Sequence, residues 1–167
     1  MSRLRTRGSL KCYLSEAITI LQKHEKKNLV KKFTEIYNYI EEYLAKEYEV
    51  EVFNPIKHES KISADEIYLR DISEIKKAHF VVAEVSLISW GVGAELMYAI
   101  MKGKPILALY NEDSPYSLSE MIRGSGVRLR KYSDKNWKTD IAKHLAEFMT
   151  ELRLFLKYER RLLPRRI

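Results

Sequence analysis

Hydrophobic residues along this chain follow two alternating spacings. Short runs that are continuously apolar, or apolar at every second position, predict β-strands over residues 10–14, 49–53, 80–85, 105–110 and 127–132. Longer stretches with hydrophobic residues every three or four positions predict helices over residues 29–44, 62–78, 92–102 and 134–161. The chain is therefore expected to alternate between strands and helices.

This alternation predicts an α/β fold. Parallel strands need a long crossover connection, and a helix between successive strands supplies it. We expect a single-domain, doubly wound sheet of five parallel strands with helices on both faces, of the Rossmann-like or flavodoxin-like type. In such sheets, ligands bind in a crevice at the carboxyl ends of the strands.

The composition agrees with one compact domain. The chain has 167 residues, 46% hydrophobic and 32% charged, and we expect one domain over residues 1–167. No apolar run approaches the ~20 residues of a membrane helix, so we expect a cytoplasmic protein without membrane association. The single cysteine, Cys12, excludes an internal disulfide, and His58 and His79 lack partners at metal-ligand spacing. We therefore expect no metal site and no cofactor.

The formal net charge is +7, with the basic excess mainly at the two ends of the chain. We interpret these ends as basic tails at about residues 1–8 and 161–167. Basic termini are more often solvated than bound to a partner. Nucleic acid binding is therefore the less favoured interpretation, and a small-molecule ligand is expected.

Glu95 lies where a buried strand leads into a helix, in the stretch VVAEVSLISWGVGAELMYA. We expect it in the first turn of that helix, where the helix dipole and free backbone amides favour a carboxylate in its ionised form. Gly91 and Gly93 lack side chains, so a ligand can approach the backbone closely there. The alternative is a surface carboxylate that merely offsets the helix dipole.

Asp71 is a second candidate because of its place on the preceding predicted helix. It lies four residues after Ile67 and four before Ile75, on the face that carries apolar side chains toward the sheet. A partly buried acid there has a raised pKa unless it is paired. Two carboxyl groups in different environments are typical of glycosidic bond cleavage. The alternative is a structural ion pair with a nearby Arg or Lys.

Three blocks of the chain, over about residues 67–124, resemble one known family: YLRDISEIKKAHFVVAEVS, SWGVGAELMYAIMKGKPILALY and SLSEMIRG. They are similar to the nucleoside 2-deoxyribosyltransferase superfamily, and most to its 2'-deoxynucleoside 5'-phosphate N-hydrolases. The resemblance implies that Glu95 is the nucleophile that attacks the anomeric carbon. It also implies that Asp71 orients the sugar or the attacking group and moves a proton.

The same resemblance implies a set of substrate-binding residues. Tyr13 matches a tyrosine near C2' of the sugar, and Ser89 and Ser119 match positions that bind a 5'-phosphate. Ser119 belongs to a segment that a neighbouring subunit contributes in the family, so we expect a homodimer or higher homo-oligomer with shared sites. The full predicted set is Tyr13, Ser89, Trp90, Gly91, Gly93, Ser119 and Arg123, with Trp90 as a candidate wall of a base pocket.

The chain departs from this family at its first loop. Phosphate-hydrolysing members have Gly-Ser-Ile-Arg-Gly-Gly after the first strand, whereas residues 15–21 here read SEAITIL. Glu16 in that loop would repel a phosphate, although it can equally face solvent. Either Lys23, Lys26 or Arg123 binds the phosphate instead, or the substrate has no terminal phosphate.

Three functions remain open at this point. The first is cleavage of the N-glycosidic bond of a (deoxy)nucleoside or nucleoside 5'-monophosphate, which releases free base. The second is transfer of deoxyribose between bases, which uses the same two carboxyl groups. The third is a non-catalytic nucleotide- or nucleic-acid-binding module, against which the presence of both Glu95 and Asp71 argues.

Overall fold

A sheet of five parallel strands lies at the centre of the molecule, in the order β2-β1-β3-β4-β5. The computed structural model describes residues 9–18, 27–58 and 62–162. The strands are β1 (Lys11–Ser15), β2 (Glu51–Phe53), β3 (Phe80–Glu84), β4 (Ile106–Asn111) and β5 (Arg128–Tyr132). The prediction of five parallel strands is confirmed.

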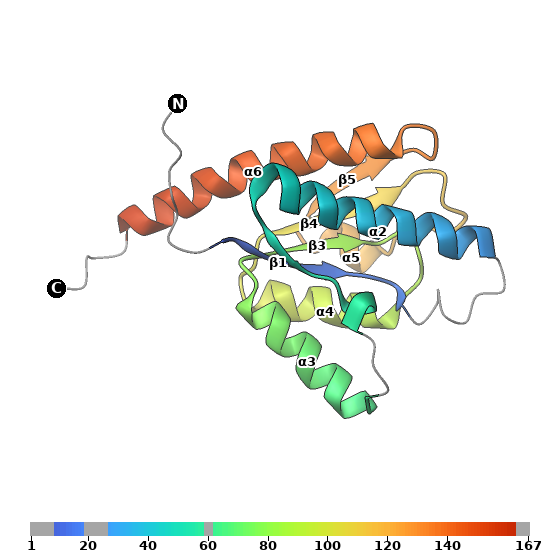
Figure 1. The fold of residues 1–167 in the computed structure, drawn as a ribbon, viewed down its shortest axis with the longest axis horizontal. Coiled ribbons are helices and arrows are strands. Elements are labelled where there is room, and N and C mark those ends of the chain that lie inside the picture. Colours follow the sequence, from blue (N-terminus) through green and yellow to red (C-terminus); the bar gives the residue numbers. More distant parts are fainter. Residues whose placement is uncertain (1–8, 19–26, 59–61, 163–167) are drawn as a thin grey trace.

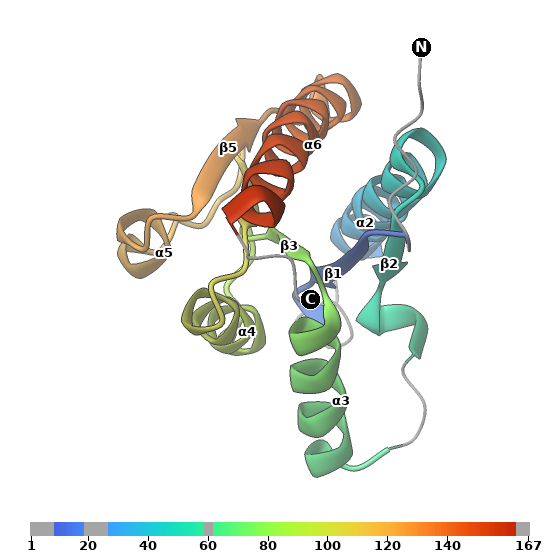
Figure 2. The ribbon, with the colours of Figure 1, turned by 90° about the vertical axis from the view of Figure 1, so that its left-hand side faces the viewer.

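Helices cover both faces of the sheet, as predicted (Figures 1 and 2). One face carries α2 (Lys27–Tyr48) and α6 (Trp137–Leu162), and the other carries α3 (Ala64–Lys77) and α4 (Trp90–Met101). The 3₁₀ helix η1 (Pro55–His58) and the short helix α5 (Glu120–Gly124) lie in connections. The hydrophobic pattern did not predict these two because each is too short to repeat the helical period.

The core fills the space between the sheet and its helices. Strand β3 is buried along its whole length, as expected for a central parallel strand. Phe80 of β3 meets Phe148 of α6, with ring centroids 5.7 Å apart. Helix α2 buries one face, formed by Phe33, Ile36, Tyr37, Ile40 and Leu44 at helical spacing. None of the helices in the described residues is long and apolar enough to cross a membrane.

Helix α3 packs against the sheet mainly through its second half. It begins with a capping box, in which Ser63 and Glu66 satisfy each other's backbone amides. Asp71 and Ile75 are buried, whereas Ile67 is 37% exposed. The prediction that Ile67 shares their buried face is wrong, because the first turns of α3 project beyond the sheet (Figure 2).

The direction of winding reverses between β1 and β3. From β1 the chain passes to β2 at one edge, then returns to β3 on the other side of β1 and continues to β4 and β5. Helix α2 follows β1 on one face, and α4 follows β3 on the other. Such a reversal leaves a crevice at the carboxyl ends of the two strands. The end of β1 and the start of α4 border this crevice.

Candidate active site

Glu95 lies at this crevice, on the side of the sheet covered by α3 and α4. Ser89 caps α4, and the helix begins at Trp90, two residues before the predicted start. Glu95 is therefore in the second turn, and the prediction of a first-turn position is wrong. Its Oε2 accepts a hydrogen bond of 2.5 Å from the hydroxyl of Ser15, the last residue of β1. This contact joins two elements that flank the crevice.

The protonation of Glu95 also differs from the prediction. Burial raises its pKa to about 7, and the neighbouring hydroxyls of Ser15 and Tyr13 oppose that shift. The expectation that the helix dipole holds Glu95 ionised is wrong, because the residue lies in the second turn of α4, where the effect of the dipole is weaker, and its carboxyl group loses much of its hydration. Both the carboxylate and the carboxylic acid are therefore populated near neutral pH.

Asp71 faces the same region from α3. The Arg70 Nε donates a hydrogen bond of 2.8 Å to Asp71 Oδ1 in a largely buried ion pair. The guanidinium also donates to the carbonyl oxygen of His58, at 3.0 Å, and lies 5.8 Å from the ring centroid of Phe53. Asp71 is thus ion-paired, yet its charge still raises the pKa of Glu95. The structure therefore brings the two predicted carboxyl groups together.

Tyr13 lies under this pair, in the middle of β1. It is fully buried, and its ring stacks on Phe53 with a centroid distance of 5.8 Å. The hydroxyl interacts with Glu95 but has no hydrogen-bond partner of standard geometry. A buried hydroxyl without a partner is costly, so a ligand that binds here can supply one.

The other predicted residues at the start of α4 take different roles. The Ser89 hydroxyl accepts a hydrogen bond of 3.3 Å from the Val92 amide, so it caps the helix. Trp90 is 93% exposed and forms no wall of a buried pocket within the chain. A Cβ on Gly91 would lie 3.7 Å from the Ser89 hydroxyl, and one on Gly93 would meet nothing within 4 Å. The space beside Gly93 is therefore open to a ligand.

Ser119 and Arg123 belong to a different part of the molecule. Ser119, the residue before α5, and Arg123 on α5 are both exposed, and Arg123 forms an ion pair with Glu120. Helix α5 leads into β5, at the opposite edge of the sheet from β2 (Figure 2). Ser15, by contrast, belongs to β1, next to β2. The hydrogen bonds and ion pairs of the described residues do not link Ser119 or Arg123 to Glu95.

The sequence pattern assigns no role to two residues near Glu95, Ser15 and Arg70. Ser15 is the first residue of the altered loop, and Arg70 lies within the block YLRDISEIKKAHFVVAEVS. Glu16 is buried, 4% exposed, so the alternative that it faces solvent is wrong. A polar residue that ends an apolar strand at the carboxyl edge of a sheet is the signal that identifies Ser15. Lys23 and Lys26 lie outside the described residues.

The histidines have structural contacts. The His58 ring stacks on Phe53 with a centroid distance of 4.7 Å, and His79 Nδ1 accepts a hydrogen bond of 2.9 Å from the Lys11 amide. Within residues 9–18, 27–58 and 62–162, no group of three or more His, Cys, Asp or Glu side chains is arranged to hold a metal ion.

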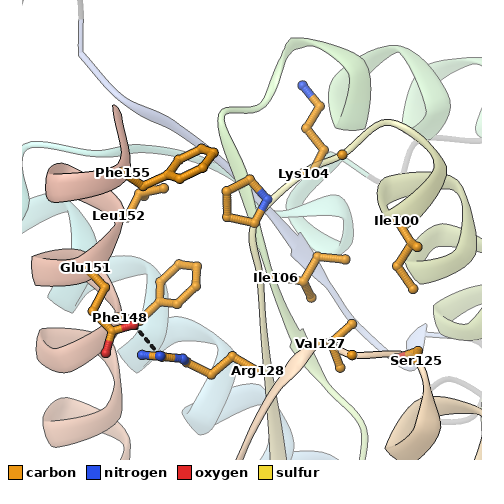
Figure 3. A pocket seen from close by; sticks show the side chains of 13 residues that line it. Ile100, Lys104, Ile106, Ser125, Val127, Arg128, Phe148, Glu151, Leu152 and Phe155 are labelled. Carbon is orange, nitrogen blue, oxygen red and sulfur yellow. Dashed lines mark ion pairs between the residues drawn. The ribbon is translucent and has the colours of Figure 1, made fainter. Parts of the chain in front are cut away.

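A cavity of about 460 Å³ lies away from this site, at the amino ends of β4 and β5 (Figure 3). Its walls come from α4, α6 and the segments before the two strands, and an Arg128–Glu151 ion pair lies at its side. None of the predicted site residues lines it. The candidate site is therefore the carboxyl end of the sheet around Glu95 and not this cavity.

Comparison with known proteins identifies the family of this chain. Residues 28–153 match the family model described as nucleoside 2-deoxyribosyltransferase. A protein of Thermofilum pendens named 2'-deoxynucleoside 5'-phosphate N-hydrolase 1 is 42% identical over 79 residues, which are 46% of this chain and 55% of that protein. The 5-hydroxymethyl-dUMP N-hydrolase of Mus musculus is 37% identical over 89 residues, 51% of each chain. The chain thus spans about half the length of these relatives.

Solved structures show the same fold. The CMP N-glycosidase of Clostridium botulinum superposes with a TM-score of 0.56 at 20% identity, over 83% of this chain and 98% of that one. At this identity the likeness concerns the fold alone. The family model, in contrast, covers well over half of this sequence and includes Asp71 and Glu95. The chain therefore belongs to the nucleoside 2-deoxyribosyltransferase family.

Proposed function

We propose that this protein cleaves the N-glycosidic bond of a nucleoside or nucleoside 5'-monophosphate and releases the free base. The observation that carries this proposal is the Ser15–Glu95 hydrogen bond at the strand-order reversal, with the charge of Asp71 close by. The names of the relatives support it, because N-hydrolysis and deoxyribosyl transfer both break the bond between sugar and base.

In the proposed mechanism, the Glu95 carboxylate attacks the anomeric carbon of the sugar. The bond from that carbon to the base nitrogen breaks, and its electron pair leaves with the base, which takes up a proton from solvent. The product is a glycosyl ester on Glu95. Water then attacks the same carbon and loses a proton to solvent, which frees the carboxylate and leaves a hydroxyl on the sugar. Only the ionised form of Glu95 performs the first step.

Asp71 and Ser15 position the reacting groups in this proposal. The Arg70 ion pair fixes the Asp71 carboxylate, so it can hold a sugar hydroxyl in a defined orientation. The Ser15 hydroxyl fixes one Glu95 oxygen through the 2.5 Å hydrogen bond. Each contact holds a reacting group in place before the reaction. Less conformational entropy is therefore lost on reaching the transition state.

The decisive experiment measures base release by chromatography. The protein is incubated with ribo- and deoxyribonucleosides and their 5'-monophosphates, alone and with a second free base. A covalent sugar adduct on the Glu95 peptide is sought by mass spectrometry after acid quenching. We expect base release and an adduct from the wild-type chain and neither from Glu95→Ala. Release by Glu95→Ala at the wild-type rate would contradict the nucleophile assignment.

The second base separates hydrolysis from transfer. Formation of a new nucleoside in its presence indicates that the second base intercepts the glycosyl ester faster than water does. Formation of the free sugar alone indicates hydrolysis. Salt-sensitive DNA binding without base release would instead support the non-catalytic alternative.

We also propose that the protein forms a homodimer or higher oligomer. Several large apolar side chains are exposed on helices α3 and α4: Tyr68, Leu69, Trp90, Met97 and Met101. Aromatic and methionine side chains are enriched at protein–protein interfaces. In an oligomer, Ser119 of one subunit could reach the Glu95 site of another. Within a single chain, α5 lies far from that site. Sedimentation velocity of the wild-type chain and of Leu69→Glu tests this, with a shift toward monomer expected for the variant.

A further inference from the structure

Glu16 is a buried acidic residue for which the proposed mechanism has no role. It directly follows β1, next to Ser15, and is 4% exposed. Neither of its carboxyl oxygens has a hydrogen-bond partner of standard geometry. Burying a polar group without a partner costs free energy, so residues in this state are often completed by a ligand.

The charges that face Glu16 come from three elements. Glu41 of α2 and Glu95 of α4 are acidic, and Lys57 of η1 is basic. The Lys57 ammonium lies 2.8 Å from Glu41 Oε2, so a carboxylate already neutralises it. Tyr37 of α2, whose own pKa is raised partly by Glu16, completes the surroundings.

Glu16 is therefore neutral at physiological pH. Burial, followed by the charges of Glu41 and Glu95, raises its pKa to about 9, and the Ile56 backbone amide and the charge of Lys57 offset this only in part. A protonated carboxyl group can donate one hydrogen bond and accept another, which is the complement of a hydroxyl group. The buried Tyr13 hydroxyl, which interacts with Glu95 but has no hydrogen-bond partner of standard geometry, has the same two capacities.

A phosphate needs different surroundings. Phosphate dianions are bound by guanidinium and ammonium groups or by free backbone amides. In the described part of this site, the cations near the carboxyl groups are Lys57 and Arg70, and both are paired with acidic side chains. Surroundings that do not keep Glu16 ionised stabilise a doubly charged phosphate even less.

We propose that Glu16 binds a sugar hydroxyl of the substrate and disfavours a phosphate, so that the preferred substrate is a nucleoside without a 5'-phosphate. This inference rests on the proposed N-glycosidic cleavage for the choice of ligand class. It sets this chain apart from the relatives whose names specify 5'-phosphate substrates.

Equilibrium binding tests the inference without turnover. Glu95→Ala protein is titrated by calorimetry with the four common 2'-deoxynucleosides and with their 5'-monophosphates. We expect at least one nucleoside to bind about tenfold or more tightly than its own monophosphate, which corresponds to ~1.4 kcal/mol. Equal or tighter binding of the monophosphates, or binding of neither class, would overturn the inference.

Variants of Glu16 test whether this residue causes the preference for a nucleoside over its monophosphate. In the Glu95→Ala background, Glu16→Gln keeps the size and hydrogen-bonding capacity of the side chain, so the nucleoside preference is expected to stay within threefold. Glu16→Ala loses the hydrogen bond and is expected to reduce the preference about tenfold. The exposed Glu42→Gln on α2 is the matched control and leaves the preference unchanged. An unchanged preference in Glu16→Ala would remove Glu16 from this role.

The preference is the ratio of the nucleoside and monophosphate affinities measured on the same preparation. Partial misfolding of a variant lowers the active fraction equally for both ligands and therefore does not change this ratio. Base release by the wild-type chain separates the two proposals. Absent cleavage, together with selective nucleoside binding through Glu16, removes the proposed function and keeps the binding role. Cleavage that favours monophosphates keeps the proposed function and overturns the inference.

Discussion

Two glutamates at the carboxyl end of the sheet have similar protonation but very different surroundings. Burial raises the pKa of both Glu84 and Glu95 to about 7. Glu84 is fully buried and accepts hydrogen bonds from the Ser86 amide and hydroxyl and, at 2.9 Å, from the Tyr132 hydroxyl. Glu95 is partly exposed and accepts a hydrogen bond from Ser15 at the end of β1.

The two residues lie on opposite faces of the sheet. Ser15 is in register with Ala83, so both side chains point toward α4, and Glu84, one residue later, points toward α2 and α6. There Ser86 extends the network, because its hydroxyl accepts a 2.6 Å hydrogen bond from the Asn111 amide. The comparison teaches that a raised pKa alone does not mark a functional acid. Access and incomplete hydrogen bonding around the acid are what distinguish the two sites.

The largest expected difference between the two glutamates is in catalysis. Glu95→Gln removes the proposed nucleophile and should lower kcat about a thousandfold or more. Glu84→Gln makes the same chemical change on the other face and should keep kcat within a few-fold. Steady-state base release by both variants checks this, with circular dichroism to confirm folding. Similar losses in both variants would mean that the proposed distinction is wrong.

The second prediction concerns stability and follows from Glu84. Its pKa in the folded chain, about 7, lies above the ordinary value of 4.5, so the folded state binds this proton more tightly than the unfolded state. The contribution of Glu84 to stability is full below pH 4.5 and declines as pH rises to 7, by about 3 kcal/mol in total. Glu84→Gln should remove this decline. Urea unfolding from pH 4.5 to 8 compares the two slopes, and equal slopes would contradict the assignment.

The sequence predicted the strands, the helices and their layers better than the contacts between side chains from distant segments. Five parallel strands and two helical layers follow from local periodicity, which the printed residues display directly. Asp71 is a candidate because it is an acid on the apolar face of its predicted helix, and Glu95 because it follows a buried strand and a glycine-containing turn. The Ser15–Glu95 contact, in contrast, joins residues 80 positions apart, and the burial of Glu16 depends on α2 and η1 packing around it. Neither can be obtained from spacing within one segment.

The predicted start of α4 is an error that a local sequence signal could have avoided. Ser89 is a favourable N-cap residue, and its hydroxyl does cap the helix at the Val92 amide. Beginning the helix after Ser89 places Glu95 in the second turn. The apolar pattern alone starts the helix at Val92 and therefore overestimated the effect of the helix dipole on Glu95.

The pH dependence of kcat/KM should be set by Glu95 and not by Glu84. If ionised Glu95 is the nucleophile, kcat/KM rises as its carboxyl loses a proton, with a midpoint near pH 7. Between pH 6 and pH 8, kcat/KM should rise about tenfold as Glu95 ionises. Glu84→Gln should keep the midpoint, because Glu84 lies on the other face. A midpoint that moves in this variant would show that Glu84 titrates with the reaction.

The smallest effect is expected from Ser15→Ala. The Ser15 hydroxyl opposes the rise in the pKa of Glu95, so its loss should move the midpoint of the kcat/KM profile to higher pH. Activity at pH 7 should fall a few-fold, and the loss should diminish at pH 9, where Glu95 is ionised in both chains. Ser86→Ala is the matched change beside Glu84 and should reduce stability by about 1 kcal/mol with no movement of the profile. A constant loss for Ser15→Ala across all pH values would instead mean that the hydroxyl only positions the carboxylate and does not stabilise its ionised form.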